Sequence, residues 1–314
     1  LNAGGGTWTG STCDANVGIG NGVMDAAMDG ASNNTAVGHI ALGALTTGDN
    51  NTTLGQAAGV AVTSGGGNVI IGQAAGSATT DVDNAVIIGR DAGAANMDSN
   101  ADGTVSVGYM AGNAITSGAR NTTIGYQASK ALVSGNDNTS LGYNSLDELV
   151  DGNRNTSVGA YAMGDDVGGT DSDGSSDNTA LGYLAGGGTW ANEDCSNIVA
   201  IGASALSGAL EGDDADGSVA VGKAALAALT SGSGSTAVGY QALTALISGN
   251  NNVAIGYQAL DEITTGGANI AIGTGALGNC DGGENENVAI GNNAGLNLDN
   301  GHNNTIVGAN ANAS

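Results

Sequence analysis

The stretch Asn252 to Gly256 (NVAIG) decides the fold, because versions of it return seventeen times along the 314 residues of the chain. Each version ends in Ile, Val or Leu followed by glycine, and ten of the sixteen intervals between these closing glycines are 17 residues long. A fixed period of this kind is typical of a repeat architecture in which each unit stacks on the next. The closing glycines are Gly20, Gly38, Gly55, Gly72, Gly89, Gly108, Gly125, Gly142, Gly159, Gly182, Gly202, Gly222, Gly239, Gly256, Gly273, Gly291 and Gly308.

The residues just before each closing glycine predict a short strand. Three positions before the glycine the residue is always Thr, Val or Ile, and one position before it is always Ile, Val or Leu. Side chains alternate along a strand, so these two positions share a face, and their branched, apolar character predicts that this face is buried. The residue between them is usually small, as at Ala237 and Ala254. We therefore expect the small residue to point outward.

The residues after the glycine predict a second short side and a turn. The third residue is Ala in fifteen of the seventeen copies, and the fourth and seventh are often apolar, as at Leu243 and Leu246. A turn signal such as Ser248-Gly249 follows. The spacing does not distinguish an extended second side from a single helical turn.

Together these patterns predict an all-β fold, a parallel β-solenoid of about 17 coils that runs as one continuous domain over residues 1–314. The interior is expected to be thin and aliphatic, because the chain has no Phe and only 3% aromatic residues. A longer repeat is superposed on the short one. Residues 4–20 (GGGTWTGSTCDANVGIG) match residues 186–202 (GGGTWANEDCSNIVAIG), ten coils apart.

Asparagine recurs four residues before the closing glycine in twelve of the seventeen copies. In a stack of coils these residues would form a column whose amides bond to one another, while Asn also tolerates the unusual dihedrals of a corner. The alternative is a polar binding ridge. The twelve residues are Asn16, Asn34, Asn51, Asn68, Asn121, Asn138, Asn155, Asn178, Asn252, Asn269, Asn287 and Asn304.

Six of the seven tyrosines directly follow a closing glycine. Three of them, Tyr109, Tyr126 and Tyr143, belong to consecutive coils and are expected to stack as a ladder along one edge. Such a column either shields the edge of the coils or presents aromatic faces to a glycan or a protein receptor.

Thirty acidic residues against five Lys and Arg give a net charge of -25, which excludes nucleic acid as a partner because its phosphates must be neutralised by cations. The acids gather where the period lengthens, in loops that either keep the protein soluble or bind calcium, a cation that prefers carboxylate and carbonyl oxygens. Calcium is the one cofactor that this pattern suggests. Its candidate ligands are Asp171, Asp173, Asp177, Asp213, Asp214 and Asp216.

The cysteines and histidines do not indicate an enzyme. Cys13 and Cys195 would lie ten coils apart and Cys280 a further five, too far for disulfides within one chain, so links between chains remain open. With the equivalent tryptophans Trp8 and Trp190, these cysteines are candidate assembly positions. No Cys-x-x-Cys metal pattern occurs, and the two histidines fall sixteen coils apart, so no catalytic group is expected.

Several copies of the repeat carry a family resemblance. The phrases Ser218 to Gly222 (SVAVG), Asn252 to Gly256 (NVAIG) and Asn287 to Gly291 (NVAIG) resemble the head repeat of trimeric autotransporter adhesins. Ser235 to Leu243 (STAVGYQAL) and Asn121 to Ser129 (NTTIGYQAS) are similar to repeats of phage tail fibres and other surface fibres. The resemblance implies a left-handed β-roll, three chains side by side, and an extracellular adhesive or spacer role at a cell surface or on a virion.

Three functions follow as expectations. The first is a non-enzymatic structural fibre or adhesin shaft, a homotrimer whose partner is a surface receptor or glycan. The second is a filament subunit that stacks head to tail through the open ends of the solenoid. The third is a solenoid that binds calcium, glycans or ice, and the inward assignment of most Thr residues argues against ice. No stretch of the sequence approaches the length of a membrane-spanning helix.

Overall fold

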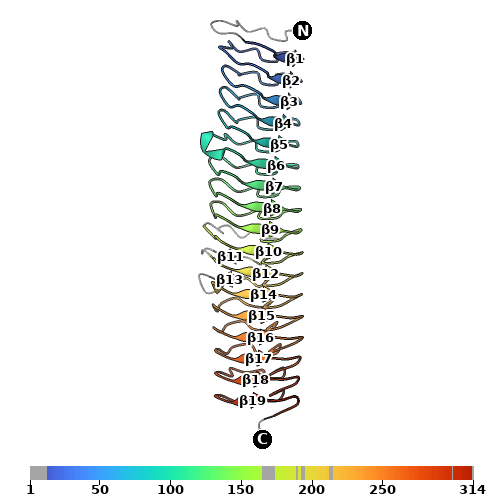
Figure 1. The fold of residues 1–314 in the computed structure, drawn as a ribbon, viewed down its shortest axis with the longest axis vertical. Coiled ribbons are helices and arrows are strands. Elements are labelled where there is room, and N and C mark those ends of the chain that lie inside the picture. The colour runs from blue at the N-terminus through green and yellow to red at the C-terminus, as the bar shows by residue number, and fades with distance from the viewer. Residues whose placement is uncertain are drawn as a thin grey trace. The chain divides into compact units, whose positions relative to one another are not determined.

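The structure is a computed structural model that describes residues 13–164, 174–188, 190–191, 195–211, 215–298 and 300–312. The chain forms two compact units, Leu1–Arg154 and Asn155–Ser314. Each unit is a parallel β-solenoid whose coils repeat about every 17 residues and contribute one short strand apiece (Figure 1). The predicted fold class is therefore confirmed. The single domain over residues 1–314 and the left-handed sense of the coil stay predictions.

Almost all regular structure is in three-residue strands. The first unit contains β1 (Val17–Ile19), β2 (Thr35–Val37), β3 (Thr52–Leu54), β4 (Val69–Ile71), β5 (Val86–Ile88), the 3-10 helix η1 (Ser99–Ala101), β6 (Val105–Val107), β7 (Thr122–Ile124) and β8 (Thr139–Leu141). The second contains β9 (Thr156–Val158), β10 (Thr179–Leu181), β11 (Trp190–Ala191), β12 (Val199–Ile201), β13 (Leu210–Glu211), β14 (Val219–Val221), β15 (Thr236–Val238), β16 (Val253–Ile255), β17 (Ile270–Ile272), β18 (Val288–Ile290) and β19 (Thr305–Val307).

Successive strands pair in parallel with equivalent residues opposite one another. In β15 and β16, Ala237 lies opposite Ala254, and in β2 and β3, Val37 lies opposite Leu54. The small strands β11 and β13 form a separate parallel pair. The strands stay in register even where a coil is longer than 17 residues, so the positions around each strand stand on their equivalents in the next coil. A sequence pattern thus becomes a set of side-chain columns.

The predicted assignment of strand faces is wrong. In β2 to β10, β12 and β14 to β19 the middle residue is buried, while the residues on either side of it are half-buried or exposed. Ala36 is fully buried, for example, whereas Leu54 is 50% exposed. The interior of a coil this short is narrow, so it accepts one small side chain from each strand, and the two branched neighbours point outward.

The interior is completed from the second side of each coil, as the pattern after the glycine predicted. Ala242, Leu243 and Leu246 are fully buried and face the buried Ala237 of their own coil's strand. Ile70, which replaces the small middle residue in β4, is buried where the fourth residue after the closing glycine is itself a glycine, Gly76. A large residue on one wall is therefore matched by a small one on the other.

The second side is neither extended nor a helical turn. The second and fourth residues after a closing glycine have left-handed backbones, as at Gln241 (φ 55°) and Leu243 (φ 53°). The amide of Gln241 donates to the carbonyl of Lys223 in the preceding coil, and that of Leu243 donates to Ala259 in the following coil. Alternate residues thus bond in opposite directions along the stack, which holds non-glycine residues in a backbone region they rarely adopt.

The closing glycines are required by backbone contact between coils. Gly125 has φ +141°, and a Cβ atom there would overlap the carbonyl oxygen of Gly142 in the next coil. The same contact recurs at Gly38 against Gly55 and at Gly239 against Gly256. Only a residue without a side chain permits this approach.

Candidate functional site

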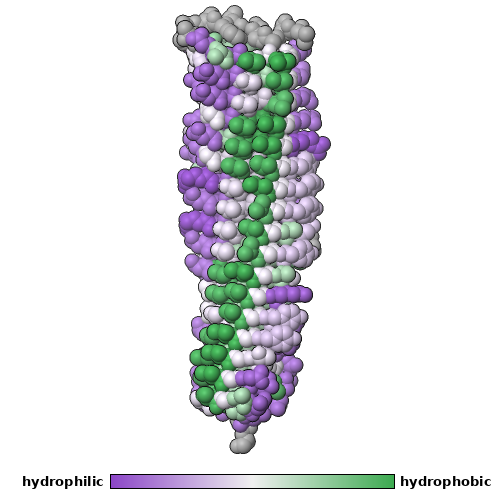
Figure 2. Space-filling view, turned by 45° about the vertical axis from the view of Figure 1, so that its right-hand side comes forward, coloured by the Kyte–Doolittle hydropathy of each residue, from purple (hydrophilic) through white to green (hydrophobic). Residues whose placement is uncertain are grey.

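The outer strand face is the most extensive candidate surface. It consists of the first and third residues of each main-sheet strand, which form a hydrophobic band on each unit (Figure 2). Its most exposed large residues are Val17, Ile19, Leu54 and Leu141 in the first unit and Leu181, Ile255, Ile290 and Val307 in the second. Each position is Thr, Val, Ile or Leu, so the face carries no charge although the chain has a net charge of -25. An extended, uncharged surface rich in aliphatic residues is typical of a protein interface.

Threonines take part in this face in register. Thr35 of β2 lies opposite Thr52 of β3, and Thr122 of β7 lies opposite Thr139 of β8. These hydroxyl-bearing residues point outward, which corrects the inward assignment made from the sequence. The row of first strand residues therefore contains short runs of threonine between valines, and it lies beside a row of larger aliphatic residues.

The predicted asparagine column is confirmed as a hydrogen-bonded ladder inside the corner of the coils. Asn51 is fully buried, and its Nδ2 donates to Oδ1 of Asn34 (3.1 Å) and to the carbonyl of Gly65 (2.9 Å). Its own Oδ1 accepts from the backbone and side-chain amides of Asn68 (3.1 and 3.0 Å). The left-handed residue of the corner is the one before each of these asparagines, as at Asn50 (φ 60°).

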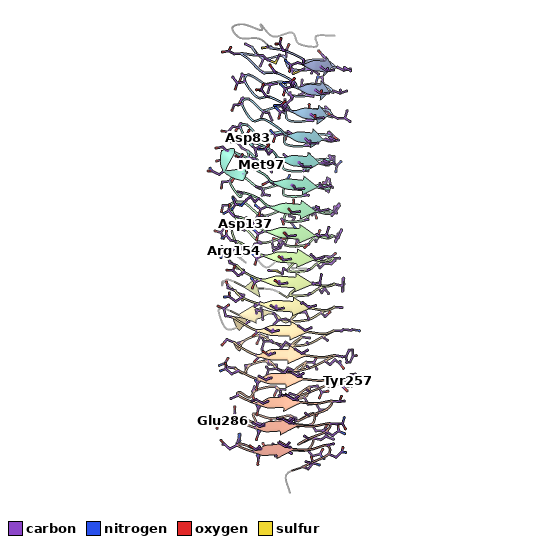
Figure 3. All side chains as sticks on the ribbon, in the orientation of Figure 1. Asp83, Met97, Asp137, Arg154, Tyr257 and Glu286 are labelled. Atoms are coloured by element: carbon purple, nitrogen blue, oxygen red, sulfur yellow. The ribbon has the colours of Figure 1, made fainter. Side chains whose placement is uncertain are left out.

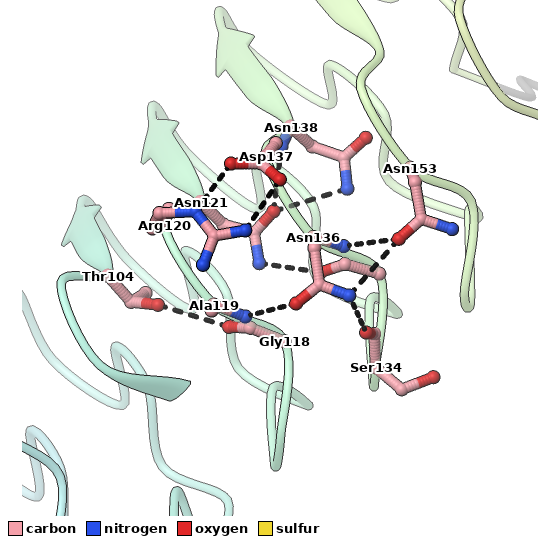
Figure 4. Close-up of polar contacts among 11 residues, drawn as sticks. Thr104, Gly118, Ala119, Arg120, Asn121, Ser134, Asn136, Asp137, Asn138 and Asn153 are labelled. Atoms are coloured by element: carbon pink, nitrogen blue, oxygen red, sulfur yellow. Dashed lines mark hydrogen bonds and ion pairs between the residues drawn. The ribbon is translucent and has the colours of Figure 1, made fainter. Parts of the chain in front are cut away.

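A second, outer ladder was not foreseen from the sequence. Six residues before the closing glycine, a side-chain acceptor takes the backbone N–H of the equivalent residue one coil earlier (Figure 4). Asn153 accepts from Asn136 (2.9 Å), and Asn136 accepts from Ala119 (2.9 Å). Aligning the repeats at this position, where Asp, Asn and Ser dominate, would have been the signal. Further acceptors in this column are Asp49, Asp83, Asp102, Asp216, Asn250, Asn285 and His302.

The structure describes only Asp177 and Asp216 among the candidate calcium ligands. Asp171, Asp173, Asp213 and Asp214 lie outside the described residues. Asp216 accepts the backbone N–H of Ser196 (2.6 Å), and Asp177 is exposed with a left-handed backbone (φ 63°). Within the described part of the chain, no group of three or more His, Cys, Asp or Glu could hold a metal ion. Calcium binding stays a prediction.

The predicted tyrosine ladder is present in the first unit. The ring centroids of Tyr109 and Tyr126 are 5.1 Å apart, and those of Tyr126 and Tyr143 are 5.2 Å apart with nearly parallel planes. The guanidinium of Arg90 lies 4.5 Å from the centroid of the Tyr109 ring and caps that end of the column. In the second unit, Tyr240 and Tyr257 stack in the same way at 5.2 Å and 12°.

The other candidate assembly residues are placed differently. Cys195 and Cys280 are fully buried, which excludes both thiols from the surface of the second unit, and the Cys280 thiol donates to the carbonyl of Leu298. Cys13 is half-buried. Trp8 and the side chain of Trp190 lie outside what the structure describes, and the backbone of Trp190 begins β11.

A partly buried ion pair in the first unit was also missed. Lys130 and Asp147 occupy equivalent positions in consecutive coils, and the Lys130 ammonium binds both Asp147 (3.1 Å) and Glu148 (2.8 Å). Asp147 is 1% exposed and its Oδ1 has no hydrogen-bond partner. Burial raises the pKa of Asp147 to about 6, and the Lys130 ammonium opposes that shift.

Hollows in the second unit lie at its two edges. One, of about 530 Å³, is lined by turn residues from Ser248 to Glu286. Another, of about 310 Å³, is lined by side chains beside the tyrosine column, including Tyr257 and Asp261. Tyr257 and Glu286 point away from opposite edges (Figure 3).

The described residues include no helix that is long and apolar enough to cross a membrane. No protein family, curated protein or solved structure matches the chain.

Proposed function

We propose that the chain is a non-enzymatic structural module that associates with copies of itself through its outer strand face to build an extracellular fibre or adhesin shaft, as a homotrimer. The observation that carries the proposal is the exposed, uncharged band of Thr, Val, Ile and Leu on each unit (Figure 2). Removing such surface from water is favourable by about 25 cal/mol for each Å² buried. In an isolated chain this surface stays in contact with water, so that free energy is not gained.

A second copy of the chain is the partner that fits this face best. The rows of the face recur once per coil, so another copy presents the same spacing and can match it row for row. The face carries no acidic residue, although acids are six times as numerous as Lys and Arg in the whole chain. Copies would therefore meet on the surface where their like charges do not oppose each other.

The test places a charge in the middle of the face. Leu54→Asp and Leu141→Asp together are expected to convert the assembly to monomers, because each carboxylate would be buried without a partner. Sedimentation velocity gives the copy number, and Asn50→Asp, on an exposed corner, is the matched control. A wild-type chain that stays monomeric at high concentration, or a double variant that still assembles, contradicts the proposal.

Head-to-tail stacking of coil ends remains the alternative mode of assembly. Electron microscopy of the purified chain separates the two, because lateral association produces discrete particles and end-to-end stacking produces filaments of variable length. Filaments that persist in the Leu54→Asp/Leu141→Asp variant favour the alternative.

A second candidate function, ice binding, is favoured by the outward threonine pairs Thr35–Thr52 of β2 and β3 and Thr122–Thr139 of β7 and β8. A thermal hysteresis assay tests it, with Thr122→Tyr to break one pair. Activity that this variant reduces favours ice binding, whereas no activity in wild type removes this candidate.

A further inference from the structure

The side-chain-lined hollow of the second unit arises from one coil with small residues between two coils with large ones. Position by position, Thr274, Gly275 and Gly278 of the middle coil follow Tyr257, Gln258 and Asp261 of the coil before. Asn293 and Leu296 form the far wall. The backbones of the two walls lie two coil spacings of about 4.8 Å apart, and their side chains leave a hollow of about 310 Å³ between them. This space suits a single flat ring and is too narrow for a helix.

The near wall presents an aromatic face. One side of the Tyr257 ring stacks on Tyr240, and Tyr257 as a residue is 51% exposed. In the next coil the column continues with Thr274, which is too small to cover the other side of the ring. The tyrosine column therefore ends at the groove with an uncovered ring.

Hydrogen-bonding groups surround this ring. Asp261 Oδ1 lies near the floor, 3.4 Å from where a Cβ of Gly278 would stand, and Oδ1 of Asn293 lies close over Gly275. The side-chain amide of Asn293 donates to Asn310 (3.2 Å), which fixes its oxygen toward the floor of the groove. These oxygens are acceptors for hydroxyl donors.

The charge of the groove limits its ligand. Asp261 and Glu262 line the near wall, and burial raises the pKa of Asp261, with the neighbouring Glu262 adding to the shift. The one Lys or Arg within residues 155–314 is Lys223, two coils away from Tyr257 along the tyrosine column. An anionic ligand would find no cation in the groove.

We propose that this groove binds a neutral oligosaccharide, with one pyranose ring stacked on Tyr257 and its hydroxyls donating to Asp261 and Asn293. An aromatic face beside acceptor oxygens suits a pyranose, which has an apolar C–H face and a rim of hydroxyl donors. The groove lies off the outer strand face, so this binding is independent of the proposed self-association.

The test uses saturation-transfer NMR and titration of the full chain with maltohexaose, cellohexaose, mannohexaose and xylohexaose. The expected result is saturation of the C–H protons of one ring face by at least one of these sugars. Tyr257→Ala should lower the affinity for that sugar about tenfold, since aromatic stacking contributes up to about 1.5 kcal/mol. Gly278→Leu should abolish binding by filling the groove, and Leu296 shows that the backbone at this repeat position accepts leucine.

Tyr126→Ala, at the equivalent position of the first unit, is the matched control and should bind as wild type does. Thermal melting of each variant verifies that it is folded, and Tyr257→Phe should retain binding because the ring face is preserved. The proposal is overturned if none of the four sugars binds. It is equally overturned if Tyr257→Ala and Gly278→Leu bind as wild type does. Hexamers of galacturonate and of glucosamine are titrated as charged probes, and binding of these alone also overturns the proposal.

Discussion

At the scale of single residues, the buried asparagine ladder connects successive coils at the corner that precedes each strand. Asn51 donates to Asn34 and to the carbonyl of Gly65, and accepts from Asn68. Its amide satisfies backbone groups that water cannot reach. Asparagine therefore serves the fold at this position, and its recurrence does not require a binding ridge.

Asn51→Ala should destabilise the first unit by roughly 2–4 kcal/mol, because the Gly65 carbonyl and the Asn68 amide both lose a partner while buried. Chemical denaturation followed by circular dichroism measures the change. Asn50→Gly, exposed and already left-handed, is the control and should remain within about 0.5 kcal/mol of wild type. Equal effects of the two substitutions would show that the ladder adds nothing to stability.

Asp147 predicts a pH dependence in the same unit. Its pKa is about 6 when folded, above its usual 3.8, so the folded chain holds a proton that the unfolded chain releases between these values. Stability from this group is therefore fully present below pH 3.8 and is lost as the pH rises through 6. The free energy of unfolding of Asp147→Asn, relative to that of wild type, should rise by up to about 3 kcal/mol between pH 4 and pH 7 and stay constant above pH 7.

Thermal melting of both proteins across this pH range measures the gain. Asp137→Asn is a control of opposite sign, because the bidentate contact with Arg120 lowers the pKa of Asp137, whose contribution is lost as the pH falls. A gain for Asp147→Asn that does not change with pH would show that Asp147 is ionised throughout.

At the scale of the coil, volume is conserved between the strand and the second side. Ile70 fills the space left by Gly59 and Gly76, whereas Ala237 is small where Leu243 is large. The sequence presents Ile70 as an exception to the pattern. A large residue fits at this position because the residue across the interior, at the fourth position after the closing glycine, is itself a glycine. Comparing only equivalent positions of the repeats does not reveal this pairing.

A double-mutant cycle tests this compensation. Ile70→Ala should cost about 2–5 kcal/mol through a cavity, and Gly76→Leu about 1–3 kcal/mol through overpacking. The double variant recreates the Ala237–Leu243 pairing, so its loss should be smaller than the sum by more than 1 kcal/mol. Ile70→Ala with the more distant Gly112→Leu is the matched control and should be additive. Chemical denaturation provides all four free energies, and strict additivity for the first pair would contradict the compensation.

At the scale of the whole molecule, the period of the sequence predicted the fold correctly but did not predict which strand residues are exposed. Equal spacing of glycines places equivalent residues over one another whichever face is buried, so the solenoid follows from the period alone. Which face of β2 or β15 is buried depends on the width of the coil. In a three-residue strand, alternation allows either the middle residue or its two neighbours to point inward. The branched pair looked like core, but the narrow interior accepts Ala36 and leaves Val37 outside.

The charge of the whole chain yields the last prediction. Copies that carry -25 each repel one another over a screening length of about 30 Å at 0.01 M salt and about 3 Å at 1 M, whereas contact through an uncharged apolar face is not weakened by screening. Sedimentation velocity should therefore show tighter self-association in 1 M than in 0.01 M NaCl. The Leu54→Asp/Leu141→Asp variant should remain monomeric in both, because its defect lies in the face itself. Association that weakens with salt would mean that ion pairs hold the copies together, and the outer strand face would then not be the contact.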